Sequence, residues 1–187
     1  MRCLLCERWS WQLLCKECQQ TLLTPTISKR TLFPDFEVIS FYPYSEIKDL
    51  LHTKHSYIGA AIYRILSKIA IKPYVDRMEG SGYLIPIDDR VVEGYSHTAV
   101  MAQAAKSDRF VPRYGVLRAR NRVNYSGKSL RFRLENPRDF IYKGPKAPIV
   151  LIDDIITTGT TLKEAYSVCK SVGADPIAAL VLADAKE

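Results

Sequence analysis

A buried strand that ends in two adjacent acids is the feature that most constrains this chain. Ile149 to Ile152 are four consecutive apolar residues, three of them β-branched. Such a run is typical of a strand covered on both faces of a parallel sheet. Asp153 and Asp154 follow it, at the end of the strand where open α/β sheets bind ligands. The pattern predicts an α/β fold with its functional site at the carboxyl end of this strand.

The five residues that we call the phosphate loop combine hydroxyl side chains with one glycine: Thr157, Thr158, Gly159, Thr160 and Thr161. A helix is expected from Leu162, because apolar residues recur at helical spacing until Gly173, a residue type common just past a helix end. Backbone N–H groups of such a loop can bind a phosphate, while carboxylates can accept hydrogen bonds from sugar hydroxyls or hold a divalent cation. Together they predict a sugar-phosphate site. The alternative is a plain strand–turn–helix with two solvated acids.

The whole motif resembles the phosphoribosyl pyrophosphate (PRPP) motif of type I phosphoribosyltransferases, in which four apolar residues and two acids precede a Thr/Gly loop. The resemblance implies a type I phosphoribosyltransferase-like fold, in which a Rossmann-like parallel sheet is flanked by helices. It also implies that Asp153 and Asp154, as the catalytic pair, face the ribose 2′ and 3′ hydroxyls. The phosphate loop would then surround the 5′-phosphate, and Mg²⁺ would accompany PRPP.

Two Cys-x2-Cys pairs at the N-terminus are separated by eight residues: Cys3, Cys6, Cys15 and Cys18. Each pair can present two thiolates from one tight turn, and two pairs supply the ligands of a tetrahedral Zn²⁺ site. A redox dithiol would explain one pair but not two, and disulfides are disfavoured in a reducing cytoplasm. We therefore expect a structural zinc ion, because four thiolates leave no open coordination position.

Chain length and composition predict one α/β domain with a small appendage, since the chain has 187 residues of which 47% are hydrophobic. We expect a zinc module and linker at 1–34, where Thr21 to Pro34 is polar, and a phosphoribosyltransferase-like domain at 35–187. A signal peptide and an apolar run of 18 residues are both missing from the sequence. The chain is therefore expected to be cytoplasmic, with the inner face of the membrane reached only through partners.

The net charge of +7 comes from one stretch, Arg113 to Lys143, which we call the basic segment. It has nine basic and two acidic residues, whereas the rest of the chain is balanced. This excess suggests a polyanion or a pyrophosphate as partner, and Tyr125 and Phe132 could stack on bases. Its weak periodicity predicts a long mobile loop or ribbon rather than a helix, and a solvated loop is the alternative. The candidates for binding pyrophosphate or DNA are Lys54, Arg90, Arg118, Arg120, Arg122, Arg131 and Arg133.

Elsewhere the hydrophobic pattern predicts further strands and helices. The expected strands are Glu37–Tyr42, Gly82–Ile87, Val116–Ala119 and Ile177–Leu182. The expected helices are Tyr44–Leu51, one through Ile58–Ile69, and one that begins after Gly94–His97.

Nearly the whole chain resembles the ComF family of phosphoribosyltransferase-like proteins, which serve DNA uptake in naturally transformable bacteria. The likeness consists of the four cysteines, Lys54, Pro86 with Arg90, Gly94-Tyr95, Arg133, Asn136, Phe140 and the PRPP motif. It implies single-stranded DNA as a partner. Proteins of the DNA-uptake motor or of recombination are further expected partners.

Three departures from the related families favour binding over turnover. Residues 93–97 read Glu-Gly-Tyr-Ser-His where the ComF family usually has Arg-Gly-Phe-Asn-Gln. Asp88 and Asp89 occupy a loop that closes on pyrophosphate in active transferases, and they would repel it unless Mg²⁺ intervenes. Thr157 stands where purine-salvage enzymes have an Asp that engages the base.

Two functions of different classes follow. The first is a protein that handles incoming single-stranded DNA with a pocket for PRPP or a 5′-phosphoribosyl group. The second is an active phosphoribosyltransferase, in which a nitrogen nucleophile of unidentified type displaces pyrophosphate at C1′. A structural adaptor, whose zinc module docks on a motor protein, is compatible with either.

Overall fold

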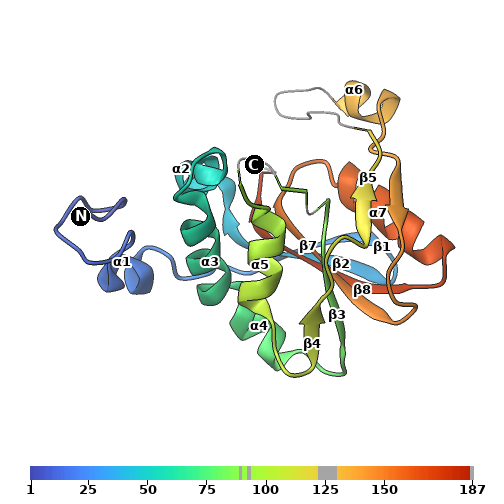
Figure 1. The fold of residues 1–187 in the computed structure, drawn as a ribbon, viewed down its shortest axis with the longest axis horizontal. Coiled ribbons are helices and arrows are strands. Elements are labelled where there is room, and N and C mark those ends of the chain that lie inside the picture. Colours follow the sequence, from blue (N-terminus) through green and yellow to red (C-terminus); the bar gives the residue numbers. More distant parts are fainter. Residues whose placement is uncertain (89, 92–93, 122–129, 186–187) are drawn as a thin grey trace.

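A six-stranded sheet forms the centre of the molecule in the computed structural model, which describes residues 1–88, 90–91, 94–121 and 130–185 (Figure 1). The strands lie in the order β1-β2-β8-β7-β3-β4, with β1 antiparallel to β2 and the other pairs parallel. Their bounds are β1 Ser28–Phe33, β2 Phe36–Pro43, β3 Gly82–Pro86, β4 Phe110–Pro112, β7 Pro148–Ile156 and β8 Asp175–Asp184. A separate antiparallel ribbon is formed by β5, Leu117–Ala119, and β6, Phe140–Tyr142.

Helices cover both faces of this sheet. One face carries α2 Tyr44–His52, α3 Gly59–Ile69, α4 Ile71–Arg77 and α5 His97–Ala105, and the turn η1 Thr53–His55 links α2 to α3. The other face carries α7 Thr160–Ser171 and the β5–β6 ribbon. The remaining helices are α1 Lys16–Thr21, in the N-terminal module, and α6 Leu130–Glu135, beyond the end of the ribbon (Figure 1).

Alternation along β7 explains how one apolar strand serves both layers. Val150 and Ile152 belong to the core beneath α3 and α5, whereas Ile149 and Leu151 belong to the core beneath α7. All four side chains are fully buried, as expected for a central strand of a parallel sheet. The same alternation directs residue 154 toward α3 and α5 and residue 153 toward the opposite layer.

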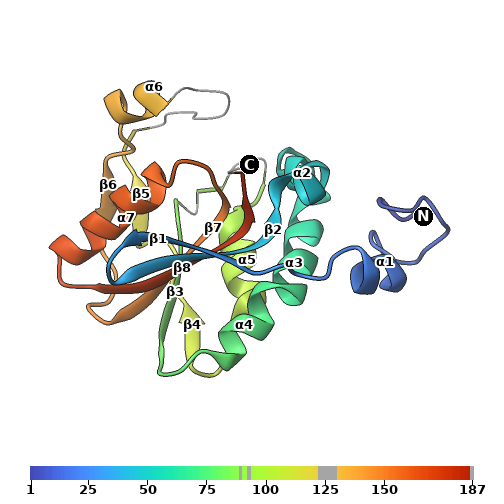
Figure 2. The same cartoon turned by 180° about the vertical axis from the view of Figure 1, so that it is seen from behind.

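The carboxyl ends of the parallel strands lie at one end of the sheet, where the start of α7 is also found (Figures 1 and 2). The β5–β6 ribbon extends toward the same end and carries α6 beyond it in both views. The functional candidates of the PRPP motif and the described part of the basic segment therefore share one end of the molecule.

The expected α/β class, with a mostly parallel sheet flanked by helices, is confirmed. The strands expected at 37–42, 82–87 and 177–182 and the helices expected near 44–51, 58–69 and 97 are present, within a few residues of their expected bounds. Residues 160–171 form a helix, and Gly173 follows it with φ 86°.

The strand expected at 116–119 is present as β5, although it lies in the separate ribbon and the sixth strand of the main sheet is β4. Two expectations were wrong. The polar stretch expected as a linker contains β1, which pairs with β2 from Ser28 to Phe33 through backbone hydrogen bonds that need no apolar side chains. The basic segment includes a helix, α6, where only a loop or ribbon was expected. The division of the chain after residue 34 stays a prediction. In the described ranges no helix is both long enough and apolar enough to cross a membrane.

Candidate functional site

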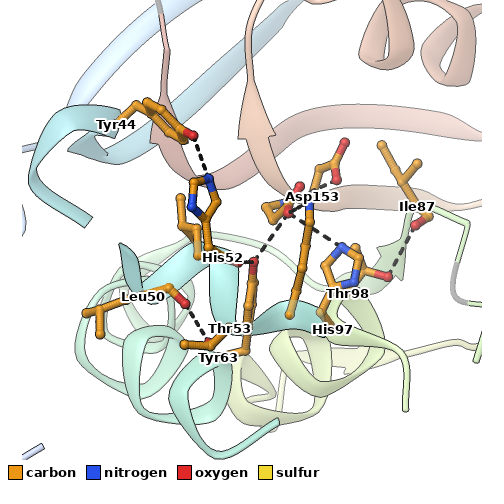
Figure 3. A network of polar contacts seen from close by, with 12 residues as sticks. Tyr44, Leu50, His52, Thr53, Tyr63, Ile87, His97, Thr98 and Asp153 are labelled. Atoms are coloured by element: carbon orange, nitrogen blue, oxygen red, sulfur yellow. Dashed lines mark hydrogen bonds and ion pairs between the residues drawn. The ribbon is translucent and has the colours of Figure 1, made fainter. Parts of the chain in front are cut away.

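Three side chains from two helical elements and one turn converge on Asp154 at the end of β7. The Lys54 Nζ lies 3.1 Å from Asp154 Oδ2, and the Tyr63 hydroxyl donates to the same oxygen at 3.3 Å. The His97 Nε2 is 3.6 Å from that oxygen. Figure 3 shows Tyr63 from α3 and His97 from α5 pointing toward the end of β7. Asp154 is 7% exposed, so its charge is stabilised by these partners rather than by water.

Asp153 and Asp154 differ in electrostatic environment although they are adjacent. Burial raises the pKa of Asp153 to about 8, and the charge of Asp154 adds to this effect. Burial would also raise the pKa of Asp154, but positive charge on His97 and Lys54 outweighs it, and the pKa of Asp154 is lowered. Because burial lowers the pKa of His97 itself, we attribute the charge that stabilises Asp154 at neutral pH to Lys54. One acid is thus held ionised and its neighbour holds a proton near neutral pH.

Local hydrogen bonds place Lys54 and His97 at this carboxylate. The Thr53 hydroxyl donates to the Leu50 carbonyl at 2.6 Å, which closes the turn that presents Lys54 (Figure 3). The Tyr95 hydroxyl donates to the Lys54 carbonyl at 2.9 Å. A Cβ at Gly59 would overlap the Tyr95 hydroxyl and the Thr53 carbonyl, so only glycine allows this approach.

The start of α5 is fixed in a similar way. The Ser96 hydroxyl caps the helix by accepting from the Ala99 N–H at 3.2 Å, and the Thr98 hydroxyl donates to the Ile87 carbonyl at the end of β3 at 3.2 Å (Figure 3). These bonds position His97 against β3 and β7. Lys54 was a candidate from the sequence, whereas Tyr63, Tyr95 and His97 were not expected as site residues. Gly94-Tyr95 was noted only as part of the family likeness, and residues 93–97 as a departure from the family pattern.

The phosphate loop connects β7 to α7 and leaves several of its backbone N–H groups available to a ligand. Gly159 adopts φ 77° as the residue before the helix, a conformation that favours glycine. Within the described part of the chain, no backbone carbonyl accepts from the N–H groups of Thr158, Gly159 or Thr161. The Thr158 and Thr160 hydroxyls lie 2.9 Å apart. These groups at a helix N-terminus are suited to bind an anion.

In the loop after β3, two arginines lie close to the carboxylate of Asp88 and balance its negative charge. Asp88, at φ 45°, is 3.3 Å from Arg90 Nε and 3.7 Å from Arg138 Nη1, and its Oδ1 accepts from the Ala119 N–H at 3.2 Å. The expected repulsion of pyrophosphate by Asp88 is therefore reduced, because two arginines balance its charge. Asp89 lies outside the described residues.

The basic segment supplies several of the arginines that were expected as binding residues near the carboxyl ends of the parallel strands. Arg118 lies on β5, and Arg120 is 3.6 Å from Asp139 with most of its side chain exposed. Arg131 lies on α6 with 88% of its side chain exposed and pairs with Glu135 at 2.7 Å. Phe132 and Arg133 also lie in α6, and Phe132 is half-buried. Arg122 and Tyr125 lie outside the described residues. All of these remain predictions as binding residues.

The four N-terminal cysteines form a cluster that fits zinc. Their Sγ atoms all lie within 4.8 Å of one another, and Cys6 Sγ is 3.7 Å from Cys15 Sγ. A tetrahedral ion with bonds of about 2.3 Å separates its thiolates by roughly 3.8 Å, whereas a disulfide requires about 2.0 Å. Burial raises the pKa of Cys3, but backbone N–H groups that include that of Cys15 outweigh it and lower the pKa to about 6. Burial raises the pKa of the Cys18 thiol, so the spacing of the four Sγ atoms is what indicates that the cluster could hold a zinc ion.

The raised pKa of Asp153 predicts a particular dependence of stability on pH. In the unfolded chain this acid titrates near 4, so between about pH 4 and 8 the folded state retains a proton that the unfolded state releases. Its contribution to the free energy of unfolding should therefore be lost as pH rises through about 8. We expect Asp153→Asn to remove this loss, as measured by urea denaturation at a series of pH values. The exposed Asp76→Asn should leave it unchanged, and an equal loss in Asp153→Asn would contradict the assignment.

Comparisons with known proteins give partial likenesses. No family model matches the chain. The transcriptional regulator GfcR of Methanosphaera stadtmanae is 47% identical over 38 residues, which are 20% of this chain and 19% of that protein. The chain thus matches about a fifth of the length of this curated relative.

Among solved structures, orotate phosphoribosyltransferase from Aeropyrum pernix is 18% identical with a TM-score of 0.42, over 91% of this chain and 81% of that one. Adenine phosphoribosyltransferase from Saccharomyces cerevisiae is 13% identical with a TM-score of 0.43, over 91% and 90% of the two chains. At these values a function for the chain has to be argued from its own site residues.

Proposed function

We propose that this chain binds PRPP or another 5′-phosphoribosyl group at the carboxyl end of β7. The observation that carries this proposal is that two kinds of polar group, hydrogen-bond acceptors and then donors, follow one another within the nine residues 153–161. Asp153 and Asp154 offer acceptors for a ribose diol, and the N–H groups of Thr158, Gly159 and Thr161 offer donors for a phosphate. A sugar that carries a 5′-phosphate has both complementary groups.

A divalent cation would complete this site with PRPP. Side-chain ligand atoms of His97, Asp153 and Asp154 lie within 4.8 Å of one another. Carboxylate oxygens suit Mg²⁺, which keeps several waters and shares substrate phosphates. The ion would balance the charge of pyrophosphate. Lys54, which pairs with Asp154 at 3.1 Å, would then bind a phosphate oxygen in place of that carboxylate.

The proposal is tested by calorimetric titration with PRPP in the presence and absence of Mg²⁺, and with ribose 5-phosphate and pyrophosphate separately. We expect both PRPP and ribose 5-phosphate to bind, with Mg²⁺ strengthening PRPP more. Binding of pyrophosphate alone would place the anion site on the basic residues instead of the phosphate loop. Failure of both sugar phosphates to bind would contradict the proposal.

We further propose that the site serves the handling of incoming single-stranded DNA during natural transformation, in line with the resemblance to the ComF family. The described arginines on β5 and α6 lie at the same end of the molecule as the phosphate loop. A DNA backbone along the ribbon would bring a terminal 5′-phosphate within reach of that loop. Motor or recombination proteins would be the protein partners, and the zinc module would be a docking element.

The DNA proposal predicts salt-dependent binding that is largely indifferent to sequence. Each phosphate contacted on a single strand contributes about −0.7 to the slope of log K against log salt, so three or four contacts give about −2 to −3. Arg131→Glu with Arg133→Glu should flatten the slope and weaken binding, as measured by fluorescence anisotropy with an oligonucleotide. Phe132→Ala or Tyr125→Ala should weaken binding with the slope intact, because stacking releases no counterions.

A matched control reverses two exposed charges, each to Glu: Arg77, the last residue of α4, and Lys106, the residue after α5. The elements α4 and β4 lie at the other end of the sheet from α6 (Figure 1). The control changes the net charge equally and should alter the slope less than the α6 variant does. Equal effects would indicate binding by net charge alone. If neither the arginine nor the aromatic variants change the affinity, DNA is bound elsewhere or not at all.

One observation favours an active phosphoribosyltransferase as the second candidate. Because Arg90 and Arg138 balance the charge of Asp88, the loop after β3 repels pyrophosphate less than its sequence indicates. In the reaction the C1′–O bond to pyrophosphate breaks, a C1′–N bond forms and the nucleophile loses a proton. Pyrophosphate release from PRPP in the presence of purine, pyrimidine and amine acceptors, measured with a coupled assay, would favour this candidate. Binding without release favours DNA handling.

A further inference from the structure

Strand β1 contacts the phosphate loop through a side chain that neither the PRPP motif nor the basic segment includes. Arg30 Nη1 donates to the Thr157 carbonyl at 2.8 Å and pairs with Asp184 Oδ1 at 3.0 Å. The side chains of Arg30 and Asp184 are only 20% and 13% exposed. The contact joins residues 127 positions apart, so it depends on the antiparallel edge strand that sequence analysis assigned to a linker.

The geometry of a peptide bond gives this contact a consequence for the anion site. In a planar trans peptide the carbonyl of one residue and the N–H of the next point in opposite directions. Arg30 holds the Thr157 carbonyl on the β1 side, so the Thr158 N–H faces away from β1. That N–H has no backbone acceptor among the described residues and is one of the three donors assigned to the phosphate.

A second residue of β1 supports the same loop. Leu32 lies at the register irregularity between Thr31 and Phe33, and its side chain packs against the core on the α7 side of the sheet. A Cβ built on Gly159 would lie 3.0 Å from Leu32 Cδ2, which shows how closely this side chain backs the glycine. Arg30 and Leu32 therefore both lie against the phosphate loop. Arg30 fixes the plane of the Thr157–Thr158 peptide, and Leu32 packs against Gly159, the left-handed residue before α7.

We propose that Arg30 is a positioning residue for phosphate binding, which acts by orienting the Thr157–Thr158 peptide rather than by touching the ligand. This role rests on the proposed function. The charge of Arg30 is already paired with Asp184, so its contribution is directional. A charged donor on the Thr157 carbonyl also polarises the peptide and strengthens the N–H on its other side.

The test compares Arg30→Met with Lys29→Met on the same strand. Lys29 is adjacent, exposed and paired with Glu37 at 2.9 Å, so its variant removes the same charge without touching the loop. Calorimetry with ribose 5-phosphate is expected to show binding about tenfold weaker for Arg30→Met and unchanged for Lys29→Met. Arg30→Lys keeps a charged donor and is expected to stay within about threefold of the unmodified chain. Because Arg30→Met removes the ion pair of a largely buried carboxylate, a second variant combines Arg30→Met with Asp184→Asn, so that the buried charge is removed together with its partner.

A spectroscopic measurement separates this role from general stability. In the ligand-free protein, ¹⁵N–¹H spectra of Arg30→Met should show the Thr158 and Gly159 amide signals shifted, with amides in the centre of β7 unchanged. Undiminished ribose 5-phosphate binding in both Arg30→Met and the double variant would overturn the positioning role while leaving the proposed function intact. Absence of ribose 5-phosphate binding by the unmodified chain would overturn the proposed function and this role with it.

Discussion

Replacing Asp153 and Asp154 together with asparagine is expected to weaken PRPP binding by about 10- to 10²-fold. Asparagine keeps the shape of each side chain, but the variant loses the charge of Asp154, the acid of the pair that is ionised near neutral pH and can act as a strong acceptor for a diol or as a ligand for a metal. A hydrogen bond to a charged group contributes about 1.5–3 kcal/mol, and one such bond is lost. Calorimetric titration with PRPP and Mg²⁺ measures the change directly.

The matched control removes two exposed carboxylates, Asp76 in α4 and Asp108 just before the start of β4, both away from the carboxyl ends of the parallel strands. Their replacement by asparagine changes the net charge by the same amount and should leave PRPP affinity within about twofold, as is usual for substitutions on an exposed surface. Unchanged affinity in the Asp153/Asp154 variant, with its fold verified by circular dichroism, would mean that PRPP is bound elsewhere.

Loss of one zinc ligand is expected to unfold the N-terminal module. A structural Zn²⁺ site contributes on the order of 10–16 kcal/mol of apparent binding free energy at neutral pH, and small modules depend on it for folding. Cys15→Ser should reduce bound zinc from one ion per chain to a small fraction, as measured by metal analysis under reducing conditions. Hydrogen exchange should then accelerate throughout the module, whereas the buried centre of β7 should stay protected because its core on the α7 side is built by other strands and helices.

Cys169 provides the control for this experiment. It is a fully buried cysteine of α7, outside the four-cysteine cluster. Cys169→Ala removes a thiol from the main core and should leave the zinc content at one ion per chain. A zinc-free protein after purification under reducing conditions, before any substitution, would contradict the zinc assignment altogether.

Local pattern in the sequence was sufficient to identify the centre of the molecule. β7 is recognisable because a strand buried on both faces must be apolar throughout, and the two acids and the Thr/Gly loop follow it directly. The cysteine cluster is recognisable because each ligand pair is formed within one turn. In both cases the groups that act together are close in sequence, so spacing alone indicates their chemistry.

Local sequence pattern did not predict three kinds of feature: a strand held by backbone pairing, elements of only a few residues, and contacts between residues distant in the sequence. β1 has only partly buried or exposed side chains, since an edge strand is held by the backbone of its neighbour, and it therefore resembles a polar linker in sequence. β4 has three residues and α6 has six, which are too few to establish a period. The pairing of Asp88 with two arginines, from its own loop and from residue 138, likewise has no local pattern.

The sequence by itself determined the α/β class, the acid pair, the phosphate loop and the candidate zinc ligands. Only the tertiary structure decided which groups surround them. Lys54 and Tyr63 reach Asp154 across 100 and 91 residues, and Arg30 reaches Thr157 across 127. The physical reason is that parallel strands bring their carboxyl ends to one edge only after the intervening helices have packed on the sheet. The partners that set the charge of Asp154 and the orientation of the phosphate loop are therefore properties of the packing, not of any single stretch of sequence.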